Sequence, residues 1–353
     1  MTEYKDIITS IRNLTNGCQP YIDITELLYK HKCYYLLSKV NAENNITRII
    51  NTENIINRNF VNERYRTCKS IFEIFENNGI PYVVIKGAIL SETAYRDPYY
   101  RHSGDLDLLI NRKNIDSVKC IFIYQGFIQG RVTDKGIQPF TRNELLFQSA
   151  MSHQIAPFIK ETGNLLCPYV NVDINTDIMW GEYKEKTEME YILKNSEPSV
   201  ICGVSIRKLS AEMGFIQLCL HHYKDLNSIY LISNGSIKLS LFCDIYLYTK
   251  NCSLNIDIVK NICNRLDVLQ YIYYCIYYTA KIFGDEYLRS YLSYFQSYKA
   301  NDILNTFGLA EKELHNWNID FFERLFGNSI NEYLKNNLSD SDFEKIKINN
   351  ESM

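Results

Sequence analysis

The chain has 353 residues, of which 46% are hydrophobic, enough for one large domain or for two to three small ones with buried cores. Its 38 basic and 41 acidic residues give a formal net charge of −3. A protein that follows a nucleic-acid backbone usually carries a basic excess, so this balance argues against extended nucleic-acid binding.

The N-terminal residues lack the apolar segment of a secretory signal, and no run approaches the roughly 20 apolar residues that span a bilayer. The 11 cysteines include no Cys-x-x-Cys pair and lie mostly in apolar runs. This pattern is typical of reduced, buried thiols and disfavours a structural zinc site built on cysteines. The sequence therefore predicts a cytoplasmic protein with no membrane segment.

Residues 1–79 are expected to be helical. Apolar residues recur at helical spacing over Ile22–Val40, and a long polar helix is expected over Asn57–Asn78. Gly79 follows that helix directly, as glycine does at a helix C-terminus.

An α/β core is expected over residues 80–185. Short apolar or alternating runs predict the strands, and the intervening 3.6-residue patterns predict the helices. In chain order these are strand Pro81–Ile85, helix Ala88–Tyr95, strand Asp105–Ile110, helix Asn114–Gln125 and strands His153–Ile159 and Pro168–Thr176. The last two are expected to form a hairpin around a loop at Glu161–Asn164.

Residues 186–335 are expected to form a helical C-terminal domain, and residues 336–353 a polar tail that frays. The predicted helices of this domain are Ala211–Tyr223, Ile237–Thr249, Ile256–Ile282 and Glu286–Tyr298. The predicted fold class is α+β, with a small mixed β-sheet core between helical N-terminal and C-terminal segments.

Asp105 and Asp107 stand at alternate positions of a predicted strand, so their side chains point to the same face. Two carboxylates so placed repel each other unless a cation lies between them. An all-oxygen site of this kind suits Mg²⁺, with Mn²⁺ as an alternative ion. The pair is therefore predicted to bind metal and to be catalytic.

A third metal ligand is expected from the later hairpin. In Pro168–Thr176, alternation places Val170, Val172 and Ile174 on a buried face and Asp173 on the polar face. Two-ion phosphoryl and nucleotidyl transfer normally needs such a third carboxylate. Asp177 and Glu182 are weaker candidates because they lie at or beyond the end of the strand.

Lys86 and Gly87 separate the first predicted strand from the next helix. Backbone N–H groups at a helix start favour anions, glycine permits close approach of a phosphate, and lysine adds a positive charge. Taken alone, Lys-Gly is commonly a structural turn, and Asp-x-Asp is commonly an edge strand with a solvated face. Because the Lys-Gly and Asp-x-Asp motifs are only one helix apart, they predict a triphosphate-binding site that faces a metal site.

Residues 80–110 resemble the uncharacterised nucleotidyltransferase family of bacterial proteins, within the polymerase-β-like nucleotidyltransferase superfamily. The shared pattern is a strand ending in Lys-Gly, a helix ending in Tyr, a loop with Pro and Arg, and an Asp-x-Asp strand followed by aliphatic residues. In this chain these features are Lys86-Gly87, Tyr95, Pro98, Arg101 and Asp105–Ile110.

The resemblance implies a nucleotide site that includes Arg101. Many superfamily members have Gly-Ser or Gly-Gly at the helix start, and Ser91 and Ser103 are candidates for that missing hydroxyl. Where the family often has Glu-Leu-His, this chain has Asp173-Ile174-Asn175, without the histidine.

The resemblance extends weakly into the C-terminal helices, where a His and a later Asp of the family look like His221-His222 and Asp244. His222 and Asp244 are taken as nucleotide contacts. The alternative is that each histidine is structural and that Asp244 is a cap or pairs with Lys238.

The function expected from these features is transfer of a nucleoside monophosphate from a nucleoside triphosphate to an acceptor, with release of pyrophosphate. The acceptor is open: a small molecule, a peptide, a protein or a tRNA end. One alternative is a glycosyltransferase that uses Asp-x-Asp to bind a nucleotide sugar, although only a short strand–helix unit precedes the motif. The other alternative is a non-catalytic nucleotide-binding or interaction module.

Overall fold

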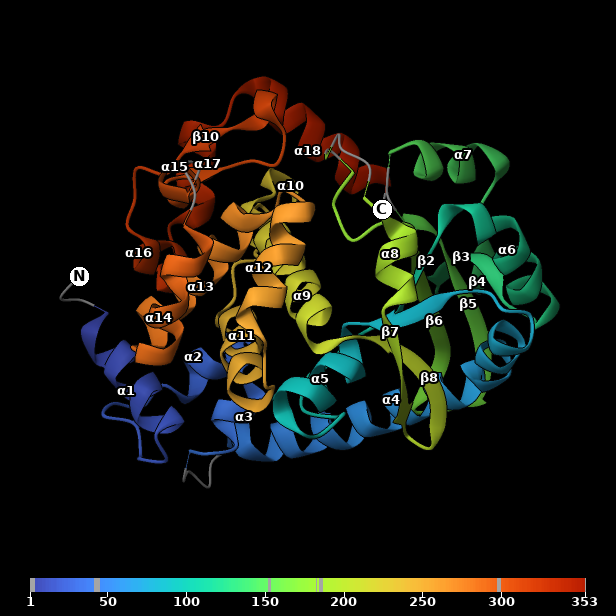
Figure 1. The fold of residues 1–353 in the computed structure, drawn as a ribbon, viewed down its shortest axis with the longest axis horizontal. Coiled ribbons are helices and arrows are strands. Elements are labelled where there is room, and N and C mark those ends of the chain that lie inside the picture. The colour runs from blue at the N-terminus through green and yellow to red at the C-terminus, as the bar shows by residue number, and fades with distance from the viewer. Residues whose placement is uncertain are drawn as a thin grey trace. The chain divides into compact units, whose positions relative to one another are not determined.

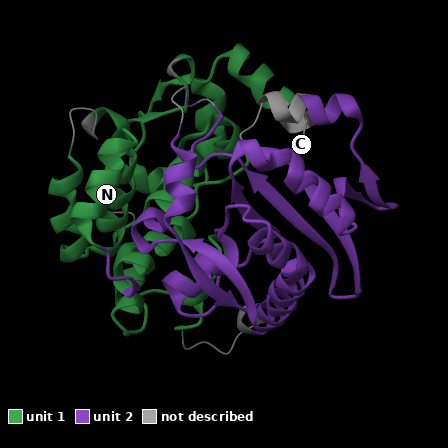
Figure 2. Ribbon diagram, turned by 45° about the vertical axis from the view of Figure 1, so that its right-hand side comes forward, with its two compact units in different colours: residues 1–47, 216–250, 255–353 green, residues 48–215, 251–254 purple. Residues whose placement is uncertain are grey.

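The computed structural model describes residues 4–40, 45–151, 154–181, 183, 187–296 and 300–352. They form two compact units, coloured separately in Figure 2. We call residues 48–215 and 251–254 the sheet unit, and residues 1–47, 216–250 and 255–353 the helical unit. The fold class is α+β, as expected from the sequence.

The sheet unit contains a six-stranded mixed sheet with the order β1-β2-β6-β5-β3-β4 (Figure 1). Only β2 and β6 pair in parallel; the other neighbouring strands are antiparallel. The strands are β1 Tyr82–Ile85, β2 Leu106–Ile110, β3 Ile128–Thr133, β4 Gly136–Pro139, β5 Gln154–Asn164 and β6 Cys167–Asn175. The helices of this unit are α4 Asn45–Asn77, α5 Gly87–Tyr95, α6 Ile115–Tyr124, α7 Arg142–Met151 and α8 Met189–Lys194, with a further hairpin of β7 Ser196–Ile201 and β8 Val204–Leu209.

One face of the sheet carries the core of this unit. Alternate residues of β2 and β6 point to that face and are almost completely buried: Leu106, Leu108, Ile110, Val170, Val172 and Ile174. They pack in one cluster with the apolar sides of α4 and α6. Because side chains alternate along a strand, the residues between them face the opposite side of the sheet. That opposite face carries the aspartates.

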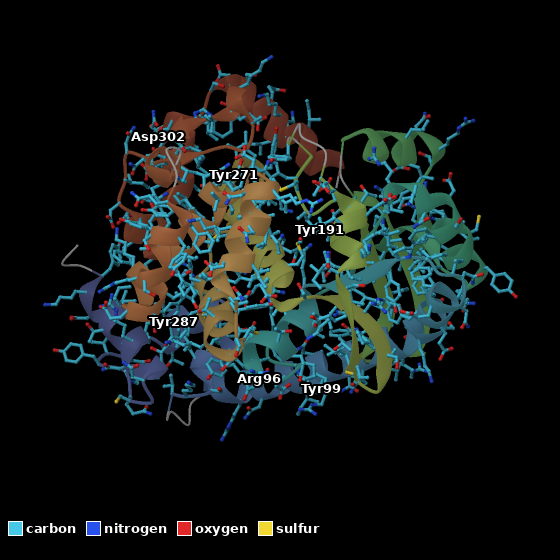
Figure 3. All side chains as sticks on the ribbon, in the orientation of Figure 1. Arg96, Tyr99, Tyr191, Tyr271, Tyr287 and Asp302 are labelled. Atoms are coloured by element: carbon cyan, nitrogen blue, oxygen red, sulfur yellow. The ribbon has the colours of Figure 1, made fainter. Side chains whose placement is uncertain are left out.

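The helical unit is built around α13 Leu269–Phe283, whose side chains are buried on most sides. Tyrosine rings fill much of this core; Tyr271, labelled in Figure 3, lies against Tyr223 with ring centroids 4.6 Å apart. The other elements are α1 Lys5–Thr15, α2 Thr25–Lys30, α3 Tyr34–Leu37, α9 Ala211–Asn227, α10 Ile229–Ile232, α11 Leu239–Asn251, α12 Ile256–Arg265, α14 Glu286–Phe295, α15 Ala300–Leu304, β9 Thr306–Phe307, β10 His315–Asn316, α16 Phe321–Phe326, α17 Ile330–Asn337 and α18 Asp340–Ser352.

Two helices expected to be continuous are each broken in two. Ile22–Val40 contains α2 and α3, separated at Lys32, and Ile256–Ile282 contains α12 and α13, separated at Asp267. Lys32 has φ of 56° and Asp267 has φ of 51°, values that no right-handed helix accommodates. Apolar spacing continues through such a break, which is why the pattern did not reveal it.

Three other expectations from the sequence need correction. The β5–β6 hairpin turns at residues 165–166, because Asn164 pairs with Cys167 and Glu161–Asn164 belongs to the strand. The β3–β4 and β7–β8 hairpins have no counterpart among the predicted strands. The C-terminal segment forms α18 instead of fraying, because Phe343 and Ile346 pack into an apolar cluster with α10 and α17. Within the described residues, no helix combines the length and apolarity needed to cross a bilayer.

Packing of the aromatic side of α6 should dominate the stability of the sheet unit. Phe122 is fully buried, with ring centroids 4.7 Å from Phe158 and 5.1 Å from Phe127. Phe122→Ala is expected to lower the free energy of unfolding by about 3–5 kcal/mol. Ile123→Ala, at the next position, which is 61% exposed, should change it by less than about 0.5 kcal/mol. Chemical unfolding followed by circular dichroism measures both, and equal losses would contradict this packing.

Candidate active site

A strained turn joins β1 to α5. Lys86 has φ of 55° and ψ of −152°, and Gly87 has φ of 43°. A Cβ atom at Gly87 would lie 3.3 Å from the Ser103 hydroxyl, so glycine permits this close approach. A lysine held in this sparsely populated conformation indicates that the turn is fixed by its surroundings.

The parallel pairing of β2 with β6 brings three aspartates together. Asp107 and Asp173 are directly opposite each other in the register of the two strands, which are adjacent in Figure 1. Neighbouring strands lie about 4.8 Å apart. Asp105 precedes β2 and points to the same face as Asp107. The structure therefore assembles the three predicted carboxylates on one sheet face.

Hydrogen bonds orient Asp107, whose side chain is only 5% exposed. The Lys86 ammonium lies 2.8 Å from its Oδ1 atom. The Asn175 amide donates to the same oxygen at 3.2 Å and to the Leu108 carbonyl at 3.3 Å. The Gln154 side-chain amide in turn donates to the Asn175 Oδ1 atom at 2.8 Å. Asn175 stands where the family resemblance places a histidine, and it acts here through Asp107.

Asp105 is held mainly through its backbone. The Ser103 hydroxyl donates to the Asp105 carbonyl at 2.8 Å and also lies 3.1 Å from its Oδ1 atom. The buried Arg64 side chain of α4 donates to the same carbonyl at 3.5 Å. Arg64 was not a sequence candidate, since no motif marks it on its long polar helix. The sequence marked Asn175 only as the residue that stands in place of the family's histidine.

The electrostatics of the three carboxylates reflect their burial and mutual repulsion. Burial raises the pKa of Asp105, and the neighbouring Asp107 raises it further. Burial, Asp105 and Asp107 together raise the pKa of Asp173 to about 7, against the opposing effect of Lys86. The site therefore holds more negative charge than the lysine balances, which favours binding of a further cation.

The other residues expected near the nucleotide differ in their surroundings. Ser91 is fully buried, donates to the Asp97 carbonyl at 2.6 Å and accepts from the Arg101 backbone N–H at 2.9 Å. Its hydroxyl therefore holds the loop between α5 and β2, and its geometry gives no support to a phosphate contact. Ser103 lies beside Gly87 and Asp105, at the centre of the site. Arg101 is half-buried on the same loop.

His222 and Asp244 belong to the helical unit, whereas the three aspartates belong to the sheet unit. Their side chains are 0% and 1% exposed and pair with each other, with Nε2 and Oδ2 3.0 Å apart. The partner of Asp244 is thus His222, not Lys238. Since both side chains are buried, neither presents a group to a nucleotide in this structure.

Asp177 follows β6 and has a local role. Its Oδ1 atom accepts hydrogen bonds from the Met179 backbone at 2.9 Å and from the Thr187 hydroxyl at 2.5 Å. This carboxylate caps the turn after the strand. Glu182, the other weak candidate, lies outside the described residues.

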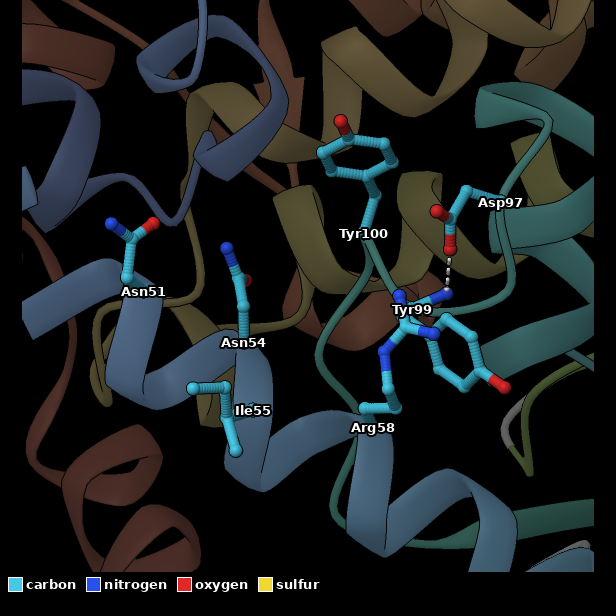
Figure 4. A pocket seen from close by; sticks show the side chains of 7 residues that line it. All are labelled: Asn51, Asn54, Ile55, Arg58, Asp97, Tyr99 and Tyr100. Carbon is cyan, nitrogen blue, oxygen red and sulfur yellow. Dashed lines mark hydrogen bonds between the residues drawn. The ribbon is translucent and has the colours of Figure 1, made fainter.

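A cavity of about 370 Å³ adjoins the loop that leads towards Asp105 (Figure 4). One side is α4, and the other is the 97–100 loop. The Arg58 guanidinium lies 4.1 Å from the centre of the Tyr99 ring, and Asp97 accepts from the Tyr99 backbone N–H at 2.8 Å. Its lining combines amide, guanidinium, carboxylate and aromatic groups. The residues are Asn51, Asn54, Ile55, Arg58, Asp97, Tyr99 and Tyr100.

The sheet unit thus has an α+β nucleotidyltransferase-like fold, with aspartates on one sheet face and helices packed on the other. Residues 27–284, well over half of the chain, match the family described as "Uncharacterised nucleotidyltransferase", and the chain belongs to this family. No curated protein shows a significant sequence match. Membership makes the protein a nucleotidyltransferase with a nucleotide as substrate.

Burial of Asp173 and its repulsion by Asp105 and Asp107 should make stability depend on pH when no divalent cation is present. The pKa of Asp173 is higher in the folded protein than in the unfolded chain, so folded protein retains a proton that unfolded chain releases. Stability should therefore fall as the pH rises from about 4 to about 7, and level off above. Asp173→Asn should raise the melting temperature at about pH 8 and change it little at about pH 4.

Thermal unfolding in a chelating buffer across this pH range measures the effect. Asp134→Asn, in the exposed turn between β3 and β4, is the matched control and should follow the wild type. If the melting temperatures of the wild type and Asp173→Asn change with pH in the same way, the raised pKa assigned to Asp173 is wrong.

Proposed function

We propose that this nucleotidyltransferase moves a nucleoside monophosphate from a nucleoside triphosphate to an acceptor hydroxyl, using a divalent metal. The observation that carries the proposal is the register of β2 with β6, which sets Asp173 opposite Asp107. In the reaction, the acceptor oxygen forms a bond to the α-phosphorus. The bond from that phosphorus to the bridging oxygen breaks, pyrophosphate leaves, and the acceptor proton passes to a carboxylate.

The three aspartates fit a site for Mg²⁺, or for Mn²⁺. All donors are carboxylate oxygens that are largely removed from water, and burial together with the charge of Asp107 raises the pKa of Asp105 and of Asp173. The three carboxylates do not gather within 4.8 Å of one another as a set. This spread is compatible with Asp105 and Asp107 holding two ions and Asp173 holding the one on the acceptor side. When bound, such ions orient the triphosphate and lower the pKa of the attacking hydroxyl.

The chain's own groups complete the nucleotide site. Lys86 lies close enough to Asp107 to contact phosphate oxygens that share a cation with it. The start of α5 at Gly87 offers backbone N–H groups to the phosphates, and Ser103 offers a hydroxyl beside Asp105. Asp173 is the carboxylate best placed to receive the acceptor proton, because it lies across from the Asp105–Asp107 pair. Arg101 is proposed as a further phosphate contact from the same loop as Ser103.

The reaction class is tested with nucleoside triphosphates labelled at the α or the γ phosphate, supplied one at a time with a cell extract and Mg²⁺. Label is expected in an acceptor from the α-labelled substrate alone, with release of pyrophosphate. Asp105→Asn and Asp107→Asn should each lower transfer on the order of 1,000-fold while the circular dichroism spectrum stays native. Asp134→Asn serves as the control with full activity.

The outcome also separates the alternatives. Transfer of γ label would indicate a kinase-type reaction, and use of a nucleotide sugar without any triphosphate would indicate a glycosyltransferase. Failure to bind any Mg²⁺–triphosphate in calorimetry would indicate a non-catalytic module. Near-normal transfer by either aspartate variant would remove the metal site from the proposal.

Substitution of Asp173 and of Asp177 should distinguish triphosphate binding from the chemical step. Asp173→Asn is expected to leave the dissociation constant of the triphosphate within about threefold, because Asp105 and Asp107 remain, and to lower the rate of transfer by roughly 100-fold or more. Asp177→Asn should change both by less than about threefold, since an asparagine oxygen still caps Met179. Single-turnover kinetics and calorimetry measure the two quantities. The reverse pattern would place the acceptor side next to Asp177.

A further inference from the structure

A second group of potential metal ligands lies on α9, in the helical unit. Among the residues that the structure describes, His221, His222 and Asp225 are the set of three such side chains whose ligand atoms all lie within 4.8 Å of one another. Asp225 follows His221 by four positions and His222 by three, so one helical turn brings it towards both histidines. The group shares no residue with the three aspartates of the sheet.

The hydrogen bond between His222 and Asp244 leaves one ring nitrogen of His222 suited to a metal. Its Nε2 atom is 3.0 Å from Oδ2 of Asp244, and an ionised carboxylate only accepts hydrogen bonds, so Nε2 carries the proton. The Nδ1 atom is then a lone-pair donor. It is buried and has no hydrogen-bond partner. A histidine whose far nitrogen is fixed by a carboxylate is the usual arrangement of a metal-binding imidazole.

The other two side chains of the group are partly exposed to solvent. His221 and Asp225 are 16% and 21% exposed, with Nε2 and Oδ2 3.5 Å apart. Lys224 lies 4.0 Å from the other carboxylate oxygen of Asp225. The two imidazole rings have centroids 5.6 Å apart. The group thus combines one fully buried potential ligand, His222, with two that are partly exposed.

We propose that His221, His222 and Asp225 bind a divalent transition-metal ion, with Zn²⁺ as the best match, and that Asp244 orients His222. Two imidazoles and one carboxylate are typical ligands of Zn²⁺, and three protein ligands leave a fourth position for water. Mg²⁺ prefers an all-oxygen site, so this group discriminates against the ion proposed for the sheet aspartates. Ligand atoms of a tetrahedral Zn²⁺ lie roughly 3–3.5 Å apart, so small side-chain rotations complete the site. The proposal is independent of the reaction proposed above.

Binding is measured on the full chain after treatment with a chelator, by Zn²⁺ competition titration and by the visible spectrum of bound Co²⁺. One ion per chain with the absorption of four-coordinate Co²⁺ is expected, unaffected by excess Mg²⁺. His221→Gln and Asp225→Asn, at half-exposed positions that should tolerate the change, should each weaken Zn²⁺ binding by about 100-fold or more. Asp244→Asn should weaken it by about 10–100-fold, because the orienting carboxylate is lost.

Two controls locate the ion. His315→Gln removes another histidine of the same unit, one that lies 3.3 Å from Asp342, and should leave binding unchanged. Asp105→Asn removes a sheet carboxylate and should also leave it unchanged. Absence of Zn²⁺ and Co²⁺ binding in the wild type, unaltered affinity in both His221→Gln and Asp225→Asn, or loss of binding in Asp105→Asn would each overturn the proposal.

Discussion

Electrostatic repulsion among Asp105, Asp107 and Asp173 is the constraint on which the sheet unit depends. Each carboxylate is largely removed from water, so its charge is poorly screened and acts strongly on the others. The Lys86 ammonium lies against this cluster at 2.8 Å from Asp107, and the Arg64 guanidinium also acts on Asp105. The remaining negative charge lowers the stability of the folded sheet unit when no further cation is bound. The same imbalance is what suits it to a metal and to the phosphates of a nucleotide.

Apolar packing on the opposite face of the same strands offsets that cost. The residues that alternate with the aspartates, such as Leu108 and Val172, are fully buried against α4 and α6. Because strand side chains alternate strictly, the packing that fixes one face also fixes the register of the other. Stability and chemistry therefore reside in the same two strands on opposite faces. The supporting bonds from Asn175 and Arg64 belong to this arrangement, since they orient groups that packing has already placed.

The helical unit uses a histidine–carboxylate pair in place of a carboxylate cluster. His222 and Asp244 are buried together, and their hydrogen bond joins α9 to α11. Pairing satisfies one nitrogen of the imidazole but leaves the other without a partner. A buried polar atom of this kind costs free energy unless something binds it. The two units thus carry different kinds of potential metal ligand, oxygen alone in one and nitrogen with oxygen in the other.

By itself, the sequence determined the class of fold, the strand–turn–helix unit around Lys86 and Gly87, and the faces on which Asp105, Asp107 and Asp173 lie. These features are local, since the alternation of a strand and the start of a helix depend on neighbours along the chain. Only the tertiary structure decided that β6 pairs in parallel with β2, and therefore that Asp173 lies opposite Asp107. It also decided that Ser91 holds a loop and that His222 pairs with Asp244. The tertiary structure also decided two helix breaks, at Lys32 and Asp267, and the formation of the β3–β4 and β7–β8 hairpins. Partners distant in the chain are chosen by packing and charge in three dimensions, and no spacing along the sequence records that choice.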